Sequence, residues 1–340
     1  MTDIRSIVLA GAVAALAAPA AAVPLDQYSS IYVFGDSLSD PGNLPSGAAP
    51  PSPPYADGGT PFVPGGAGVR FSDGDVWAEQ VGVTGNFAFG GAQATPEDGG
   101  PPDLAEQIGL FDGYSALVGG AADGANDLAA IWLGANDLFA AIDAARGSVL
   151  LGGTVDAALA GVEAVANAAA AAVGDGIEAL AARGFESFAV FNLPALEQTP
   201  LYNLFRPGDA EFAERGTDVF NAALQAEVDA LTALDVTLID VTGIFEDLVE
   251  NPEAYGFVTS VLPCVIPATE GTPGSICEDS EDYVFFDAVH PTSGVHALVA
   301  EAFRDAVAPI PLPAGLPLLA LGLGGLAFAG RRSARGRVAR

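Results

Sequence analysis

The sequence has no lysine, and its 340 residues include only two histidines, two cysteines and one methionine. Its positive charge comes from 12 arginines against 43 acidic residues, so the formal net charge is -31. A protein this acidic repels phosphate backbones, which disfavours nucleic acid as a partner. Two cysteines and two histidines are also too few for a cysteine/histidine zinc framework of the usual spacing.

Apolar residues, by contrast, make up 50% of the chain. This share excludes disorder over most of the sequence, because such a chain can bury a large apolar core. The length suffices for one large domain or two small ones.

The N-terminus has the pattern of a secretory signal peptide. Arg5 precedes an apolar run over 7–18, and alanines fill 20–22. A basic start, a short apolar stretch and a small-residue site predict export with cleavage after Ala22. The alternative is a core strand or helix.

The C-terminus carries a second targeting pattern. Residues 309–314 read Pro-Ile-Pro-Leu-Pro-Ala, an apolar run covers 315–330, and five arginines follow. This layout resembles the VPLPA variant of the bacterial PEP-CTERM sorting tails, with Ile310 where that variant has valine. The resemblance implies membrane retention, then processing by a sorting protease, and a cell-surface or extracellular protein. A permanent membrane anchor is the alternative. Signal peptide 1–22 and tail 309–340 leave 23–308 as the folded domain.

Short apolar runs alternate with helical patterns through this domain. A proline- and glycine-rich loop covers 41–68, a length typical of functional or mobile loops. Such alternation predicts a parallel sheet covered by helices on both faces, with ligands beyond the carboxyl ends of the strands. The strands are expected at 30–34, 87–89, 129–133, 188–191 and 236–241, and helices at 154–182, 209–234 and 294–307.

A serine directly follows the first expected strand. Residues 35–39 read Gly-Asp-Ser-Leu-Ser, which puts Ser37 at a strand-to-helix turn where its hydroxyl can attack a carbonyl. Because position 39 is serine, this is not the G-x-S-x-G elbow, which argues against an α/β-hydrolase. The alternative role for Ser37 is a helix N-cap.

A serine nucleophile needs a base, and only His290 and His296 are available. Asp287 lies three residues before His290, a spacing at which its carboxylate can orient the imidazole. His296 has Ser293 at the same offset and lies in the closing helix, so His290 is the preferred base. Activity should fall at acid pH, because the imidazole must be neutral to accept a proton.

Acyl transfer also needs donors for the developing oxyanion. The Ser37 backbone N–H, Gly91 after the second strand and the Asn136 side chain after the third can supply them. The letters Gly-Ala-Asn-Asp occur twice, at 124–127 and at 134–137. Only the second copy follows a strand, so Asn136 is preferred over Asn126.

These blocks together resemble the GDSL family of serine esterases and lipases, also called SGNH hydrolases. The matching stretches, in the family's order, are 35–43, 86–92, 134–137 and 287–292. The resemblance implies a three-layer α/β/α flavodoxin-like fold with about five parallel strands. It implies Ser37 as nucleophile, His290 as base and Asp287 as the residue that orients the base. Ser37, Gly91 and Asn136 become the oxyanion donors, with Gly90 as the alternative to Gly91.

The resulting expectation is a serine ester hydrolase that works through an acyl-enzyme on Ser37. The resemblance implies no metal or organic cofactor. The substrate is a small-molecule, lipid or glycan ester, and the sequence does not choose among these. Two other functions remain open, acyl transfer to a surface glycan and non-catalytic binding at a surface or matrix.

Three further features carry expectations of their own. Cys264 and Cys277 are the only cysteines, and in an exported domain they are expected to form a disulfide. The acidic run at 278–282 is read as a solvated charge cluster, with calcium binding as the alternative. Phe139 and Ile142 are read as core residues, with an acyl pocket as the alternative.

Overall fold

The computed structural model describes residues 25, 27–45, 55–56, 58–120, 126–266 and 274–308. The expected signal peptide 1–22 and tail 309–340 lie outside the described residues, as does part of the loop 41–68.

Five parallel strands form the central sheet, in the order β2-β1-β3-β4-β5. This is the strand order of flavodoxin-like doubly wound sheets, so the expected fold class is confirmed. β1 and β3 are apolar and almost wholly buried, as strands covered on both faces must be. The strands are β1 (Ser30–Gly35), β2 (Gly85–Asn86), β3 (Asp127–Trp132), β4 (Ser187–Phe191) and β5 (Asp235–Ile239).

The second strand is the one that was misplaced. It was expected at 87–89, but β2 ends at Asn86. The chain nevertheless continues alongside β1, because Phe87 N donates to Val33 O over 2.7 Å and Phe89 N donates to Gly35 O over 3.1 Å. The expected segment therefore borders β1 without the full strand ladder.

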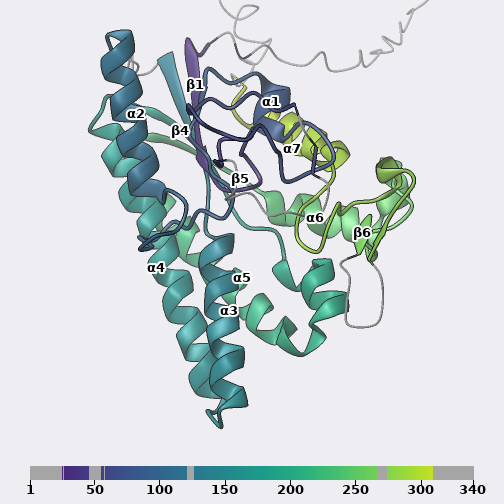
Figure 1. The fold of residues 1–340 in the computed structure, drawn as a ribbon. Coiled ribbons are helices and arrows are strands. Elements are labelled where there is room, and N and C mark those ends of the chain that lie inside the picture. Colours follow the sequence, from purple (N-terminus) through teal and green to yellow (C-terminus); the bar gives the residue numbers. More distant parts are fainter. Residues whose placement is uncertain are drawn as a thin grey trace, which may run out of the picture.

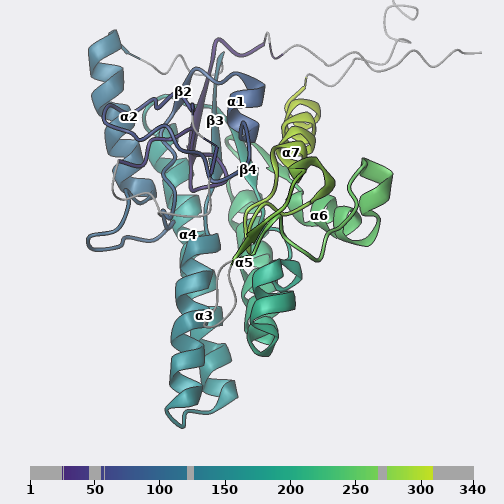
Figure 2. The same cartoon turned by 45° about the vertical axis from the view of Figure 1, so that its right-hand side comes forward.

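Helices cover both faces of the sheet (Figures 1 and 2). On one side lie α2 (Leu104–Val118), α4 (Val155–Ala181) and α5 (Ala210–Ala230), where Phe111 of α2 packs edge-on against Tyr32 of β1. On the other side lie α1 (Trp77–Val81) and α7 (Ser293–Ala306). There Trp77 and Phe303 pack on Phe191 of β4.

The remaining elements are short or lie outside these layers. α3 (Ala135–Leu150) pairs with α4 in a hairpin that projects beyond the sheet, at the bottom of Figures 1 and 2. α6 (Val241–Glu250) follows β5, and β6 (Val265–Ile266) and β7 (Ser275–Ile276) form a small antiparallel pair. Single turns occur at Leu196–Gln198, Leu201–Phe205, Pro207–Asp209, Pro252–Tyr255 and Ser280–Asp282.

Sequence patterning located α4, α5 and α7 but not α2, α3 or α6. α2 begins with a capping box, in which Asp103 accepts from Glu106 N and the Glu106 carboxylate accepts from Asp103 N. α4 is long and apolar enough to cross a membrane by length and composition alone. Its buried face, which includes Val162, Val173 and Ile177, packs within the fold.

Candidate active site

Ser37 lies in the turn that follows β1, at the carboxyl edge of the sheet. The turn is closed by two hydrogen bonds, from Leu38 N to Asp36 Oδ1 over 3.0 Å and from Ser39 N to Asp36 O over 3.0 Å. Ser37 is 7% exposed, and its Oγ lies 2.8 Å from His290 Nε2. The structure thus brings the predicted nucleophile and the predicted base together from opposite ends of the domain.

His290 and Asp287 lie on a tight loop between β7 and α7. An isolated bridge joins Phe285 to Pro291, and Phe286 N donates to His290 O over 2.8 Å. Inside the loop, His290 Nδ1 lies 2.8 Å from Asp287 Oδ2. This contact favours the tautomer with the proton on Nδ1, which leaves Nε2 free to accept the Ser37 proton.

Every oxygen of the Asp287 carboxylate has a donor. Oδ1 accepts from Val289 N over 2.9 Å and from His290 N over 2.7 Å. Burial raises the pKa of Asp287, but the facing His290 and these hydrogen bonds outweigh burial and lower it to about 2. The carboxylate is therefore charged over the whole neutral range and can stabilise a protonated imidazole.

Tyr55 adds a contact that sequence reasoning missed. Its hydroxyl donates to Asp287 Oδ2 over 2.9 Å, so this oxygen has two partners. The ring packs against Phe71, with centroids 5.0 Å apart, and lies edge-on to His290 at 6.0 Å. Burial raises the pKa of Tyr55, which keeps the hydroxyl protonated and able to donate. Its position in the 41–68 loop, whose length is typical of functional or mobile loops, was the available signal.

The expected oxyanion donors gather on the other side of Ser37. Asn136 lies in the first turn of α3, where its Nδ2 donates to Ala92 O over 2.9 Å. The same nitrogen donates a second, long hydrogen bond of 3.4 Å to Asp36 Oδ2, so this N–H would have to exchange that acceptor for a substrate oxygen. Gly134 precedes α3 at φ +125°, where a β-carbon would lie 2.5 Å from the Phe220 ring.

Hydrogen bonding distinguishes Gly90 from Gly91. Gly90 N donates to the buried Asp40 Oδ2 over 2.8 Å, so it is occupied. For Gly91 N and Ser37 N, no partner occurs among the residues that the structure describes. Gly91 adopts φ +81°, a conformation that favours glycine. These contacts favour Gly91 over Gly90 as a donor, in line with the sequence-based preference.

Asp36 differs from Asp287 although both carboxyls are buried. Burial raises the pKa of Asp36 to about 7, and the Leu38 hydrogen bond and the nearby His290 only partly oppose it. Asp36 therefore changes charge near neutrality, next to Asn136.

The two alternative residues lie elsewhere. Asn126 directly precedes β3, whose first residue pairs with Ser30 at the start of β1, so it lies at the opposite edge of the sheet. His296 is fully buried, and neither ring nitrogen has a hydrogen-bond partner within the described part of the chain. Burial lowers the pKa of His296 to about 3, so the ring is neutral.

A mainly apolar pocket opens beside Ser37 and His290. Phe139 and Ile142 were expected in the core, with an acyl pocket as the alternative. Ile142 lies fully buried in the core, and Phe139 lines the pocket. Its other apolar lining includes Leu38, Pro194, Leu196, Phe245 and Phe285.

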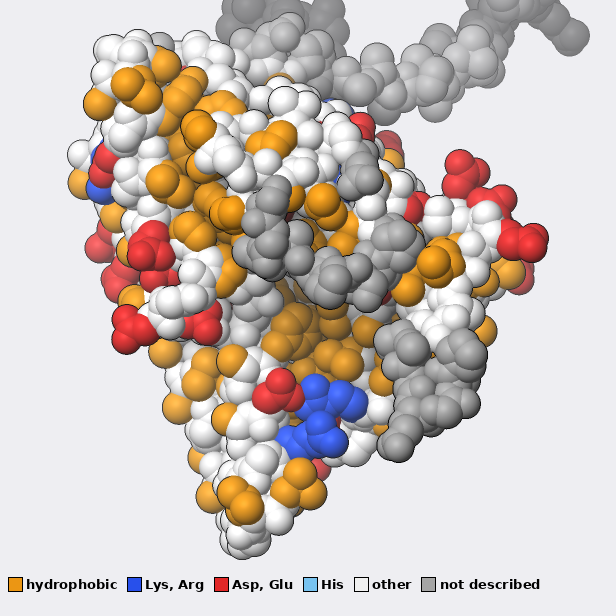
Figure 3. All heavy atoms as spheres, viewed as in Figure 1, with side chains coloured by type: hydrophobic (Ala, Val, Ile, Leu, Met, Phe, Trp, Pro, Cys, Tyr) orange, Lys and Arg blue, Asp and Glu red, His pale blue; other side chains and the backbone are white. Residues whose placement is uncertain are grey.

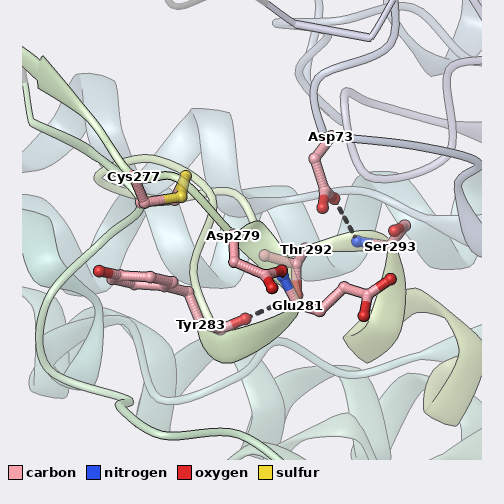
Figure 4. The surroundings of a disulfide bond; sticks show 8 residues. Asp73, Cys277, Asp279, Glu281, Tyr283, Thr292 and Ser293 are labelled. Carbon is pink, nitrogen blue, oxygen red and sulfur yellow. Dashed lines mark hydrogen bonds between the residues drawn. A yellow bond between two sulfur atoms is a disulfide. The ribbon is translucent and has the colours of Figure 1, made fainter.

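Cys264 and Cys277 form a disulfide, with their Cα atoms 4.8 Å apart. Figure 4 shows the surroundings of this bond, with Asp279 and Glu281 among the residues drawn, and the hydrogen bond from Ser293 N to Asp73 Oδ1 at the start of α7. The acidic residues of 278–282 are exposed. In the described ranges, no group of three or more His, Cys, Asp or Glu residues could hold a metal ion.

Comparison with known proteins gives one family and several relatives. The family model for GDSL-like Lipase/Acylhydrolase matches residues 31–303. The chain is 26% identical over 302 residues to the thermolabile hemolysin of Vibrio parahaemolyticus, covering 84% of this chain and 65% of that protein. It is also 26% identical over 331 residues to the phosphatidylcholine-sterol acyltransferase of Aeromonas hydrophila, covering 81% and 88%.

A shorter match and a match to a solved structure accompany these. A GDSL esterase/lipase of Arabidopsis thaliana is 30% identical over 143 residues, covering 38% of this chain and 39% of that protein. The chain thus covers 65% of the length of the hemolysin and 39% of the length of this plant relative. Among solved structures, phospholipase A1 from Streptomyces albidoflavus NA297 aligns with a TM-score of 0.42 and 15% identity, covering 82% of this chain and 99% of that one.

Proposed function

The chain belongs to the GDSL-like lipase/acylhydrolase family, and we propose that it is a serine ester hydrolase that works through an acyl-enzyme on Ser37. The observation that carries the proposal is a continuous pair of contacts. Ser37 Oγ lies 2.8 Å from His290 Nε2, and His290 Nδ1 lies 2.8 Å from Asp287 Oδ2. This is the geometry that a serine–histidine–aspartate catalytic triad requires.

In the first half-reaction, Ser37 Oγ attacks the ester carbonyl while its proton moves to His290 Nε2. The Asp287 carboxylate stabilises the imidazolium that forms, and Nδ1 keeps its own proton. The tetrahedral intermediate collapses, its C–O bond to the alcohol breaks, and His290 returns the proton to the leaving alcohol. The acyl group is then bonded to Ser37 Oγ.

Water completes the cycle. His290 Nε2 takes a proton from a water molecule, whose oxygen attacks the acyl carbon. The bond to Ser37 Oγ breaks, the proton returns to that oxygen, and the carboxylic acid leaves. In both halves the negative oxygen is held by the N–H groups of Ser37 and Gly91 and by the Asn136 amide. The absence of competing partners for Ser37 N and Gly91 N in the described chain supports these roles.

The pocket supports an apolar acyl group as the part of the substrate that is bound beside Ser37. Phe139, Leu196 and Phe285 line it, and such surfaces gain from burying alkyl groups. A lipid ester or a small-molecule ester suits this lining better than a bare sugar.

Acyl transfer to another acceptor is the second candidate. The likeness to a protein named phosphatidylcholine-sterol acyltransferase, of which 88% is covered, favours it. Transfer needs only an alcohol in place of water in the second half-reaction. A hydroxyl group of a surface glycan is one such alcohol. A purely binding function would not need the Ser37–His290–Asp287 contacts.

We further propose that the folded domain is 23–308, exported by the signal peptide 1–22 and held at the membrane by the tail 309–340. A sorting protease would then act on the tail, at the cell surface or outside. The apolar run at 7–18 and the proline-rich motif before 315–330 support this proposal.

A p-nitrophenyl ester series from acetate to long acyl chains tests the function. The full chain is compared with Ser37→Ala and with Ser148→Ala, a control on α3 away from the pocket. We expect turnover that Ser37→Ala abolishes and Ser148→Ala leaves unchanged. Added alcohols and sugars then report transfer. Folded wild-type protein without turnover on any chain length would contradict the hydrolase.

A further inference from the structure

The far end of the α3–α4 hairpin exposes apolar side chains that no part of the described chain covers. Leu150 is 76% exposed, Leu151 is 91% exposed and Val155 at the start of α4 is 42% exposed. Figures 1 and 2 show this end projecting away from the sheet. Exposed leucines are common singly, but two adjacent ones at a protruding tip form a contact surface.

One face of α3 connects this tip to the pocket. Asn136, Phe139, Asp143, Arg146 and Leu150 follow each other at intervals of three and four residues, so they share one helix face. The first two line the pocket, and the last lies at the tip. With a rise of 1.5 Å per residue, the two ends of this row are about 21 Å apart.

Two arginines lie between the pocket and the tip. Arg206 Nη2 contacts Asp143 over 2.5 Å, its Nε contacts Asp209 over 2.7 Å, and Arg146 Nε lies 3.8 Å from the same Asp209. Their charges balance, so this region is locally neutral in a chain of net charge -31. In Figure 3, a hollow lined with apolar side chains lies above a group of blue and red side chains, and a few further apolar side chains lie near the bottom of the molecule.

We propose that the hairpin tip is a docking surface for a lipid bilayer. Leu150 and Leu151 would enter the headgroup region, and the long side chains of Arg146 and Arg206 would lie at the level of the phosphates. Because Arg146 and Arg206 are paired with Asp143 and Asp209, these four residues together carry no net charge and repel a lipid surface less than the rest of this acidic protein does. Docking in this way brings the pocket to within about 21 Å of the inserted Leu150, along the same face of α3.

The same features disfavour a protein partner at the tip. Two leucines and a valine offer far less surface than a stable protein interface buries. A second copy would bring together two chains of net charge -31. A bilayer needs only a small apolar insertion beside a part of the surface that does not repel it.

Tryptophan fluorescence gives a local test that does not depend on the termini or on ester hydrolysis. The native Trp77 and Trp132 are fully buried and serve as a constant background. Leu151→Trp places a reporter at the tip, and Leu117→Trp places one at the 88%-exposed Leu117 of α2. The probe is a vesicle of phosphatidylcholine and phosphatidylglycerol in a 4:1 ratio.

We expect a blue shift with vesicles for Leu151→Trp and none for Leu117→Trp in the full chain. Equal shifts, or no shift at position 151, would overturn the proposal. So would a shift that grows with protein concentration without vesicles, because it would indicate a second copy.

Activity supplies the second readout, and only this readout rests on the proposed hydrolase. The double variant Leu150→Glu/Leu151→Glu is matched by Leu117→Glu/Val118→Glu, also on exposed apolar residues. We expect the tip variant alone to lose about tenfold of its rate on an ester carried in vesicles, with the rate on a dissolved short ester unchanged. Equal effects of the two variants would count against docking at the tip. An inactive wild type would contradict the hydrolase and leave the fluorescence result standing.

Discussion

The two sides of the active site are built in different ways. On one side, Ser37, Gly91 and Asn136 follow directly after β1, the segment beside it and β3, so the parallel sheet brings them to one edge. On the other side, Asp287 and His290 occupy a loop with no strand or helix of its own. Hydrogen bonds hold this loop in place instead of a sheet. Both carboxylate oxygens of Asp287 accept such bonds.

The buried carboxyls show the same contrast in their pKa values. Asp36, on the sheet-built side, has a pKa raised to about 7, whereas Asp287, in the loop, has one lowered to about 2. Burial acts on both, and the difference lies in the number of donors and the charged partner that each carboxyl faces. The two sides can therefore be tested separately, through Asp36 and Asn136 on the sheet-built side and through Tyr55 on the loop-built side.

The largest expected effect concerns Asp36 and stability. Its folded pKa of about 7 lies above the value of about 3.9 in unfolded chains. Between these values the folded state binds more protons, so this group lowers stability as pH rises from about 4 to about 7. The full effect is on the order of 4 kcal/mol.

Asp36→Asn, which mimics the neutral carboxyl, removes this term. We expect the unfolding free energy of the variant relative to wild type to increase between pH 4 and pH 8, measured by denaturant titration. Asp287 works in the opposite direction, because its lowered pKa adds stability above about pH 4 that is lost as pH falls toward 2. A variant-to-wild-type difference that stays constant with pH would refute the assignment of Asp36.

The next effect concerns the sheet-built side during catalysis. Asn136→Ala removes an oxyanion donor, and such losses cost about 10²–10³ in kcat. Asn126→Ala is the matched control, since it alters the other Gly-Ala-Asn-Asp copy at the opposite edge of the sheet. Steady-state kinetics on a p-nitrophenyl ester should show the loss for Asn136→Ala alone. Comparable losses in both variants would mean that Asn136 acts through folding.

The smallest effect concerns Tyr55 on the loop-built side. Tyr55→Phe keeps the ring packing but deletes the hydrogen bond to Asp287 Oδ2. Because a hydrogen bond to a charged group contributes about 1.5 kcal/mol or more, we expect kcat to fall about tenfold with little change in KM. The acid limb of the pH profile should also move, since Asp287 loses a donor.

Tyr114→Phe is the control for Tyr55, because Tyr114 packs against Phe62 and Phe87 away from the base. A change in KM alone, or equal effects in both variants, would assign Tyr55 to the pocket wall instead of to positioning.

The same contrast explains what the sequence could predict. Ser37 and Asn136 were found because strand ends are local signals, and Asp287 because it lies three residues from His290. Tyr55 is 232 residues from Asp287, and no local pattern joins them. α3 was missed because it starts directly after β3, and β2 was misplaced because the chain continues to pair with β1 after the strand ends.

The most direct measurement is covalent labelling with a fluorophosphonate, followed by mass spectrometry of the peptides. The account predicts a single adduct on Ser37, absent from Ser37→Ala and formed far more slowly in His290→Ala, with His296→Gln as the histidine control. An adduct on another residue, or labelling that persists in Ser37→Ala, would contradict the central claim that Ser37 and His290 act as nucleophile and base.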